Sequence, residues 1–124
     1  MIDFKNPQYL KLHEVKDAGF IKVVKEFLCP DENIIGVFKS VRDGIVFTNK
    51  RLVVVGVEGV TGKKKDMTSL PYSKIQAFAI ETPGVVDLDS ELQLWYSGLG
   101  LVRLEFVSGS AIKNICKIIS QYVL

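Results

Sequence analysis

Between residues 33 and 107, apolar and polar residues alternate with a period of two, and turn-forming residues interrupt the alternation at short intervals. Alternation of this kind is typical of β-strands that bury one face. The clearest examples are residues 90–96 and 101–107, joined by a turn that contains Gly98 and Gly100. The whole pattern predicts seven short antiparallel strands, at residues 33–40, 45–47, 52–57, 66–70, 73–82, 90–96 and 101–107. Seven strands with tight connections form either two packed sheets or a partly open barrel.

The segment after residue 111 changes to helical spacing. Its apolar stripe consists of Ile112, Ile115, Cys116, Ile119, Tyr122 and Val123, and polar residues such as Lys113 and Lys117 occupy the opposite side. A one-sided apolar stripe must pack against another element, and the predicted sheets are the only candidate. We therefore expect an amphipathic C-terminal helix that closes one open end of the roll or barrel.

The first thirty residues are also predicted to be helical. Asn6 and Pro7 form a helix-start signal, because asparagine is a good N-cap and proline is tolerated at the first helical position. Further on, apolar residues between Phe20 and Leu28 repeat at helical spacing, and Pro30 ends the segment. We expect a helical extension over residues 1–30, a main body over 31–124, and a single domain over 1–124.

Two details of the predicted strands bear on packing. Residues 52–57 form an almost unbroken apolar run, which predicts a strand buried on both faces. Its second face would be covered either by the N-terminal helices or by another copy of the chain. The apolar residues Ile75 and Phe78 are separated by an odd step, which predicts a β-bulge near Gln76 and Ala77.

The composition argues against several classes of function. The chain has 124 residues, with 16 Lys and Arg against 14 Asp and Glu, and this small surplus argues against nucleic acid as a partner. Cys29 and Cys116 belong to no CxxC motif and fall on apolar helical faces, so buried free thiols are expected. The N-terminus has no apolar signal region and no stretch approaches the roughly 20 apolar residues of a membrane span, so we expect a cytoplasmic protein.

Enzymatic motifs are also missing from the sequence. His13 is the only histidine, and no catalytic partner lies near it in sequence. The glycines between residues 56 and 62 do not open a helix in a βαβ unit, as a dinucleotide or phosphate loop requires. The acids of residues 87–91 lack the surroundings of a calcium loop. We predict no catalytic residue, no cofactor and no metal site.

Five blocks, in order along the chain, resemble the signature of the bacterial pleckstrin-homology (PH) domain family: VFTNKRL at 46–52, GVTGKK at 59–64, PYSKI at 71–75, ET at 81–82 and DLDSEL at 87–92. Pro83 and the pair Val85-Val86 depart from the family pattern in one loop. The resemblance implies a mainly β, α+β fold, the PH-like roll or partly open barrel, in a cytoplasmic protein without enzymatic activity. It further implies a homo-oligomer, with a five-fold ring expected, and a hydrophilic surface for protein binding where strands of neighbouring protomers meet.

Two groups of charged residues are candidates for binding. Alternating acids on an exposed strand can meet the basic residues of a neighbour, although a plain solvated face is the alternative. The predicted polar interaction surface consists of Lys50, Arg51, Glu81, Asp87, Asp89 and Glu91. This surface and the resemblance to the bacterial PH domain family together predict a non-catalytic oligomeric module. The module would present several copies of the surface to an unidentified protein partner.

The alternative function is an adaptor that binds an anionic, phosphoinositide-like lipid headgroup through Lys63, Lys64 and Lys65. Lipid-binding PH domains concentrate basic residues in the first hairpin loop, which here holds only Lys39 and Arg42 beside Asp43. Membrane contact is therefore not favoured over a solvated loop tip.

Overall fold

The computed structural model describes residues 2–3, 5–16, 19–41, 43–58, 64–86, 88–107 and 112–124, without the side chains of residues 57 and 58. The strands are β1 (Gln8–Glu14), β2 (Ile34–Lys39), β3 (Gly44–Thr48), β4 (Arg51–Glu58), β5 (Lys64–Pro71), β6 (Ile75–Glu81), β7 (Ser90–Tyr96) and β8 (Gly100–Phe106). The helices are α1 (Gly19–Lys25) and α2 (Ile112–Val123), with a short 3-10 turn, η1 (Tyr72–Lys74), between β5 and β6. No helix in these ranges is long and apolar enough to cross a membrane.

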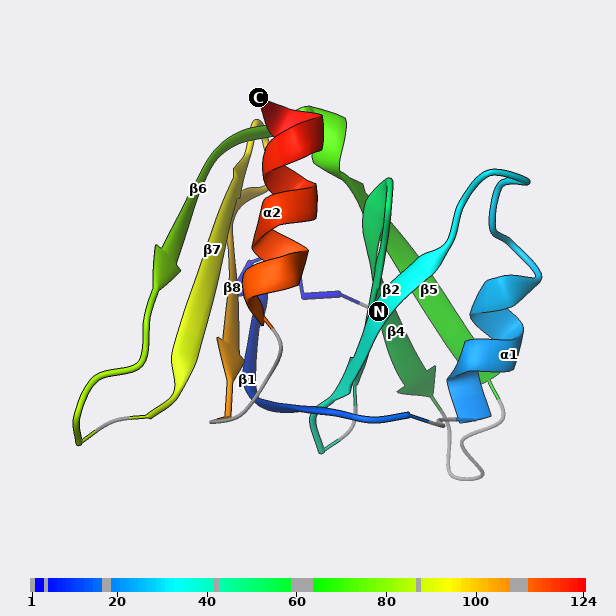
Figure 1. Ribbon diagram of the computed structural model, residues 1–124. Coiled ribbons are helices and arrows are strands. Elements are labelled where there is room, and N and C mark those ends of the chain that lie inside the picture. The colour runs from blue at the N-terminus through cyan, green and yellow to red at the C-terminus, as the bar shows by residue number, and fades with distance from the viewer. Residues whose placement is uncertain are drawn as a thin grey trace.

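The strands form one curved sheet in the order β5-β4-β3-β2-β1-β8-β7-β6. All neighbours are antiparallel except β1 and β8, which are parallel. Strand β1 therefore joins a half made of β2–β5 to a half made of β6–β8. Figure 1 shows the two halves on either side of the opening over which α2 lies. The expected mainly β, partly open barrel with a C-terminal helix is thus confirmed.

The N-terminal part of the prediction is wrong, because residues 8–14 form strand β1 and the sheet has eight strands instead of seven. Tyr9 and Leu12 are both buried although they are three residues apart. The β1–β8 register shifts between them, and Lys11 has a positive φ of 56°. This irregularity turns both side chains inward and removes the two-residue alternation by which a strand is recognised in a sequence. Within residues 1–30, only Gly19–Lys25 is an α-helix in the described part.

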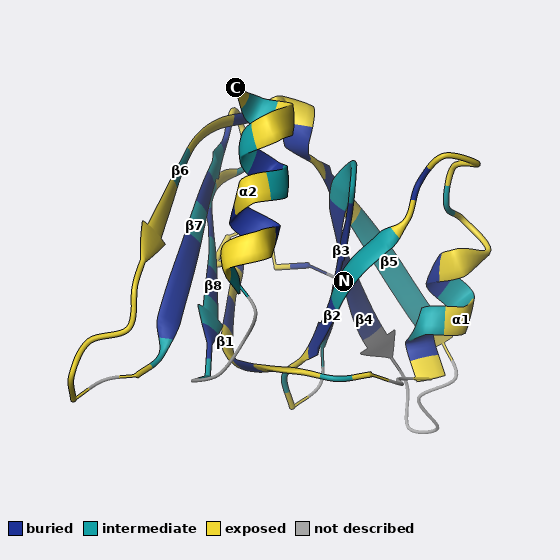
Figure 2. Ribbon diagram, viewed as in Figure 1, coloured by how far each residue is buried: buried dark blue, intermediate teal, exposed yellow. Residues whose placement is uncertain are grey.

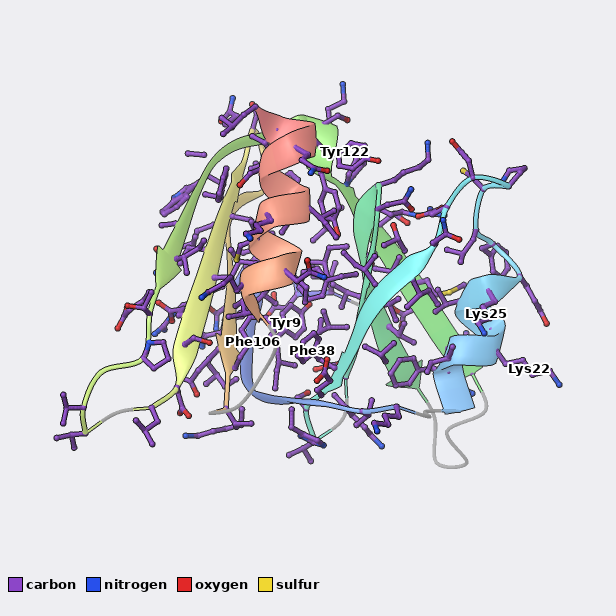
Figure 3. All side chains as sticks on the ribbon, viewed as in Figure 1. Tyr9, Lys22, Lys25, Phe38, Phe106 and Tyr122 are labelled. Carbon is purple, nitrogen blue, oxygen red and sulfur yellow. The ribbon has the colours of Figure 1, made fainter. Side chains whose placement is uncertain are left out.

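The main core lies between the two halves of the sheet and is closed by α2. The three rings of Phe38, Phe47 and Phe106 meet there, with the Phe38 centroid 5.7 Å from that of Phe47 and 4.9 Å from that of Phe106. Ile115 and Ile119 of α2 pack into the same cluster. Figure 3 shows Phe38 and Phe106 near the N-terminal end of α2, and Figure 2 shows that most residues of β7 are buried. The predicted apolar stripe of α2 is therefore a core stripe, although Tyr122 at its end is exposed.

A second, smaller core explains the apolar run of residues 52–57. Phe20 and Val24 of helix α1 pack on the outer face of β3 and β4, where they contact a group of valines that includes Val53 and Val55. Of the two expected covers, the chain's own N-terminal helix is the one present. The fit is close, since a Cβ on Gly44 would lie 2.6 Å from the Phe20 ring. A glycine is therefore required where α1 crosses β3.

Two smaller expectations have different outcomes. The β-bulge is confirmed, because the β6–β7 register shifts between Ile75 and Ala77. The prediction of buried free thiols is confirmed only for Cys116. Burial raises the pKa of the Cys116 thiol to about 11. Cys29 is free but exposed, because it follows α1 in the turn toward β2 instead of continuing the apolar stripe.

Candidate functional site

The structure divides the predicted interaction residues between two places. Lys50 and Arg51 lie at the β3–β4 turn beside η1, where the Tyr72 amide donates to the Lys50 carbonyl at 3.1 Å. Glu81 lies at the far end of β6, next to the start of β7. Strand β6 spans about 20 Å between these places, at roughly 3.3 Å per residue. Asp87 lies outside the described residues.

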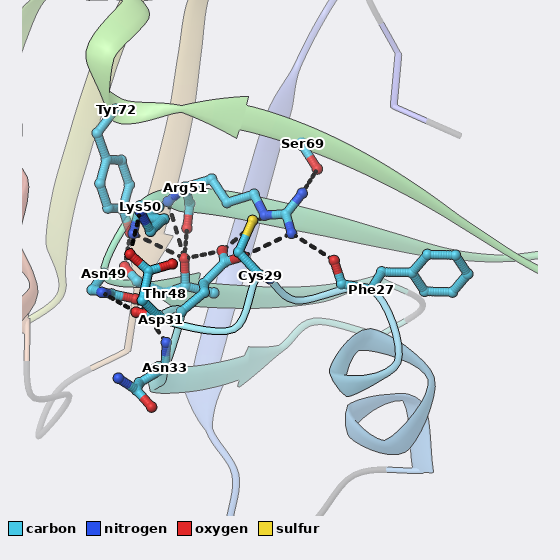
Figure 4. Close-up of polar contacts among 11 residues, drawn as sticks. Phe27, Cys29, Asp31, Asn33, Thr48, Asn49, Lys50, Arg51, Ser69 and Tyr72 are labelled. Carbon is cyan, nitrogen blue, oxygen red and sulfur yellow. Dashed lines mark hydrogen bonds and ion pairs between the residues drawn. The ribbon is translucent and has the colours of Figure 1, made fainter.

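At the β3–β4 turn, Arg51 is held by a buried carboxylate that the sequence analysis did not single out. Glu32 is only 5% exposed, and its two carboxylate oxygens accept from Nε and a terminal nitrogen of Arg51, both at 2.8 Å. The guanidinium also donates to the Ser69 hydroxyl and to the Phe27 carbonyl, each at 3.0 Å (Figure 4). Four of the five N–H donors of Arg51 are therefore occupied within the chain.

The neighbours of Arg51 in the sequence TNKR, residues 48–51, stabilise the same turn. The Thr48 hydroxyl donates to Glu32 at 2.6 Å and accepts from the backbone amides of Lys50 and Arg51, each at 3.0 Å. The Tyr72 hydroxyl donates to the Thr48 carbonyl at 2.7 Å. Thr48 is fully buried, so its polar atoms are matched by partners inside the protein. The turn is thus specified by hydrogen bonds that link β3, β4, η1 and the segment before β2.

Asn49 and Lys50 attach the turn to residues 31–33. The Asn49 side-chain amide donates to the Asp31 carbonyl at 3.1 Å and accepts from the Asn33 amide at 2.7 Å. The Lys50 ammonium lies 3.0 Å from the Asp31 carboxylate, and this hydrogen bond lowers the pKa of Asp31. Because the pair is exposed, we assign it little stabilising energy. The signal that sequence reasoning overlooked is the acidic pair Asp31-Glu32 directly before a strand.

The pKa of Glu32 is set by two opposing effects. Burial would raise it, but hydrogen bonds from Arg51, Thr48 and the Cys29 amide, together with the charge of Arg51, outweigh the burial. The net result is a pKa lowered from 4.5 to about 2. Glu32 is therefore ionised throughout the neutral range and serves as a structural anion, not as a proton donor.

A hollow of about 370 Å³ lies beside this turn, lined in part by Cys29, Lys50, Arg51 and Tyr122. Its two cations are already paired with Glu32 and Asp31. In the part of the chain that the structure describes, no three His, Cys, Asp or Glu side chains gather in a way that could hold a metal ion. The polar groups at the β3–β4 turn therefore stabilise the turn itself.

Glu81, Asp89 and Glu91 lie on the outer side of the sheet half made of β6, β7 and β8. Glu81 stands directly opposite Glu91, and Glu91 directly opposite Glu105, so three carboxylates form one row across three strands, here called the acidic row. Arg103 forms an ion pair with Glu91, and Lys11 of β1 lies 3.8 Å from Glu105. Like charges on neighbouring strands destabilise a sheet, and these two cations partly offset the repulsion among the three carboxylates.

Asp89 joins the same surface, because its carboxylate lies 3.4 Å from the ammonium of Lys11. We call the acidic row together with Lys11, Asp89 and Arg103 the outer charged face. Helix α1 covers the outside of β3 and β4, whereas neither described helix covers this outer side of β7 and β8. Three of the six predicted surface residues, namely Glu81, Asp89 and Glu91, are thus brought together.

Two lysines of the alternative lipid site, Lys64 and Lys65, lie at the start of β5. Lys64 is exposed and stands opposite Glu58 in the β4–β5 register, and Lys65 is half-buried opposite Val57. Lys63 lies outside the described residues. Lipid binding by this segment stays a prediction.

Comparison with known proteins agrees with this architecture. The sequence pattern of the family described as Bacterial PH domain matches residues 4–123. The uncharacterized protein YjqA of Bacillus subtilis is 45% identical over 105 residues, covering 83% of this chain and 84% of the relative. A second uncharacterized protein of that organism, YozO, is 29% identical over 82% of this chain and 88% of its own length.

Solved structures lead to the same family. A DUF1696 family protein with a pleckstrin-homology domain from Shewanella loihica superposes with a TM-score of 0.74 and 34% identity, over 94% of this chain and 100% of that one. A pleckstrin-homology domain from Shewanella amazonensis gives a TM-score of 0.60 and 38% identity, over 89% and 92% of the two chains. The half-barrel, its C-terminal helix and the match along nearly the whole sequence together show that the chain belongs to the bacterial PH domain family.

Proposed function

We propose that the chain is a non-catalytic cytoplasmic module that assembles into a homo-oligomeric ring, with five protomers expected, and binds a protein partner at the protomer junctions. The observation that carries the proposal is the acidic row on the outer side of β6, β7 and β8, which no described helix covers. A row of three carboxylates costs stability in an isolated sheet, and complementary basic groups of another chain would recover it.

The geometry of the outer charged face also suits binding. Glu91 is nearly buried and is held by Arg103 and by the Gln93 amide, which donates to it at 2.9 Å. Groups fixed in this way lose little freedom when a partner docks. A closed ring presents several copies of its protomer junctions at once, so a weak contact with the partner at each junction becomes a stronger multivalent one. Such a ring needs a heterologous interface, in which the charged face meets a different surface of the next protomer.

The test is the solution mass of the wild-type chain and of Glu81→Lys, measured by light scattering over a dilution series. We expect the wild type to keep a mass near five times 13.8 kDa, independent of concentration. Glu81 is exposed and stands opposite Glu91, so a lysine there should leave the protomer at least as stable as before. The same lysine should repel the basic partner surface and weaken assembly at least tenfold.

Glu26→Lys is the matched control, because Glu26 is also exposed but lies beside α1, away from the outer charged face. It should assemble like the wild type. A wild-type mass of 13.8 kDa at every concentration would contradict the ring, and equal assembly of both variants would contradict a junction at the acidic row.

The alternative prediction, anionic-lipid binding, has a separate test. In sedimentation with phosphatidylserine-containing vesicles at low salt, we expect wild-type protein to stay in the supernatant, because Lys64 stands opposite Glu58 and Asp66 directly follows Lys65. Salt-sensitive binding that is lost in Lys63→Ala/Lys64→Ala/Lys65→Ala would favour the lipid adaptor instead.

A further inference from the structure

One edge of the sheet is open beside an apolar groove. Strand β6 is last in the strand order, so the outer side of its backbone has no partner among the described strands. Figure 1 shows β6 at the outer edge with α2 alongside, and Figure 2 shows β6 largely exposed. Between β6 and α2 lies a groove of about 370 Å³, with Ile80, Ile112 and Cys116 in its walls. Ligand pockets in proteins generally measure roughly 300–1,000 Å³.

The exposure of Ile80 indicates that the core is incomplete at this edge. Ile80 stands directly opposite Leu92, so both side chains point to the inner face of the sheet. Leu92 is fully buried, whereas Ile80 is 43% exposed. The difference arises because Leu92 has a strand on each side and Ile80 has a strand on only one. An additional strand beyond β6 would cover Ile80 and fill the groove.

The rim of the groove is positively charged. Lys113 and Lys117 line it from α2, one helical turn apart, and both are exposed. Neither forms an ion pair with any residue that the structure describes. Four helical residues advance about 6 Å, close to the roughly 6.6 Å between alternate residues of a strand. Two acidic side chains on the same side of an extended segment therefore match the spacing of the two lysines.

We propose that this groove binds an extended acidic–apolar peptide segment of a partner protein, which adds a strand to β6. The backbone of the segment would pair with the open edge of β6, its apolar side chains would enter the groove, and its carboxylates would meet Lys113 and Lys117. Edge pairing supplies affinity in this mode of recognition, and the side chains that enter the groove supply specificity. The groove lies on the inner side of the sheet, so the proposal does not depend on the ring or on the outer charged face.

The distribution of charge around the groove favours a partner protein over a second copy of this chain. The other free sheet edge, β5, begins with Lys64 and Lys65 and would bring like charges toward the lysines of the rim. The sequence VVDLD at residues 85–89 also combines apolar and acidic residues, but the carboxylate of its Asp89 already lies 3.4 Å from the Lys11 ammonium. A lipid tail could fill the groove but would leave the backbone groups of β6 unpaired.

The test uses two fluorescein-labelled peptides, Thr-Ile-Thr-Val-Thr-Glu-Thr-Glu and the same peptide with lysines in place of its glutamates. We expect the acidic peptide to bind the wild-type protein saturably in fluorescence anisotropy, with a Kd below 1 mM, and the basic peptide not to bind. Lys113→Glu/Lys117→Glu should weaken binding of the acidic peptide at least tenfold. On binding, amide exchange along Ile75–Glu81 should slow, as backbone pairing requires.

Lys22→Glu/Lys25→Glu carries the same charge change on α1 and is the matched control (Figure 3). It should bind the acidic peptide like the wild type. Equal loss in both double variants, no saturable binding up to 1 mM, or unchanged exchange in β6 would overturn the proposal. A lower solution mass of Lys113→Glu/Lys117→Glu than of wild type would also overturn it, since the groove would then hold a second copy.

Discussion

Replacing Arg51 with leucine is expected to destabilise the fold by about 3–5 kcal/mol, as is common when one member of a buried ion pair is removed. Glu32 would keep its buried position and lose both hydrogen bonds from the guanidinium. Ser69 and the Phe27 carbonyl would lose their donor as well. Urea unfolding at pH 7 would measure the loss as a fall in midpoint at unchanged m-value.

The acid dependence of stability should reveal the same pair. The folded-state pKa of Glu32, about 2, lies below its ordinary value of 4.5. This group therefore contributes stability that is fully present above pH 4.5 and is lost as pH falls toward 2. The shift corresponds to about 3 kcal/mol at 1.36 kcal/mol per unit. In Arg51→Leu this part of the acid-induced loss should shrink.

Glu32→Leu/Arg51→Leu separates the charge effect from packing. Two apolar residues leave no buried ion without a partner, so the double variant should regain part of the stability that Arg51→Leu loses. A double variant less stable than Arg51→Leu, or an Arg51→Leu protein within 1 kcal/mol of wild type, would contradict the role assigned to the pair.

Phe38→Ala should cost about 3–5 kcal/mol, the usual range for deleting a fully buried aromatic side chain. The Phe38 ring is 0% exposed and makes edge contacts with Phe47 of β3 and Phe106 of β8. Its removal leaves a cavity between the two halves of the sheet, where neither half can collapse without moving the other. Urea unfolding again gives the measurement.

The matched control for this cavity is Phe27→Ala. Phe27 has the same side chain but is 63% exposed, so its loss should cost well under 1 kcal/mol. If the two alanine variants were equally stable, the assignment of Phe38 to the centre of the core would be wrong.

Sequence patterns predicted those elements whose burial follows a regular period. Leu92, Leu94 and Tyr96 alternate and are all buried, and the helical stripe of α2 faces the core through Ile115 and Ile119. Strand β1 could not be found in this way, because its register shift places Tyr9 and Leu12 on the same side at a spacing of three. Local irregularity thus removed the signal on which strand prediction depends.

The candidate residues show a similar division. The spacing of Asp89 and Glu91 on one strand edge was visible in the sequence, and the structure places both on the outer charged face. The role of Arg51 was not visible, because Glu32 lies 19 residues earlier and comes close only through the pairing of β2 with β3 and of β3 with β4. Long-range partners of this kind have no periodic signature.

The position of β1 has a consequence for how the protein is made. Gln8 and Arg103 are 95 residues apart in sequence yet lie side by side in the parallel pair at the centre of the sheet. A ribosome synthesises the chain from its N-terminus, so β1 emerges about a hundred residues before the strand that completes its pairing. The two halves of the sheet therefore cannot be joined co-translationally until β8 has been synthesised. Such a high contact order favours slow folding and leaves β1 dependent on β2 in the meantime.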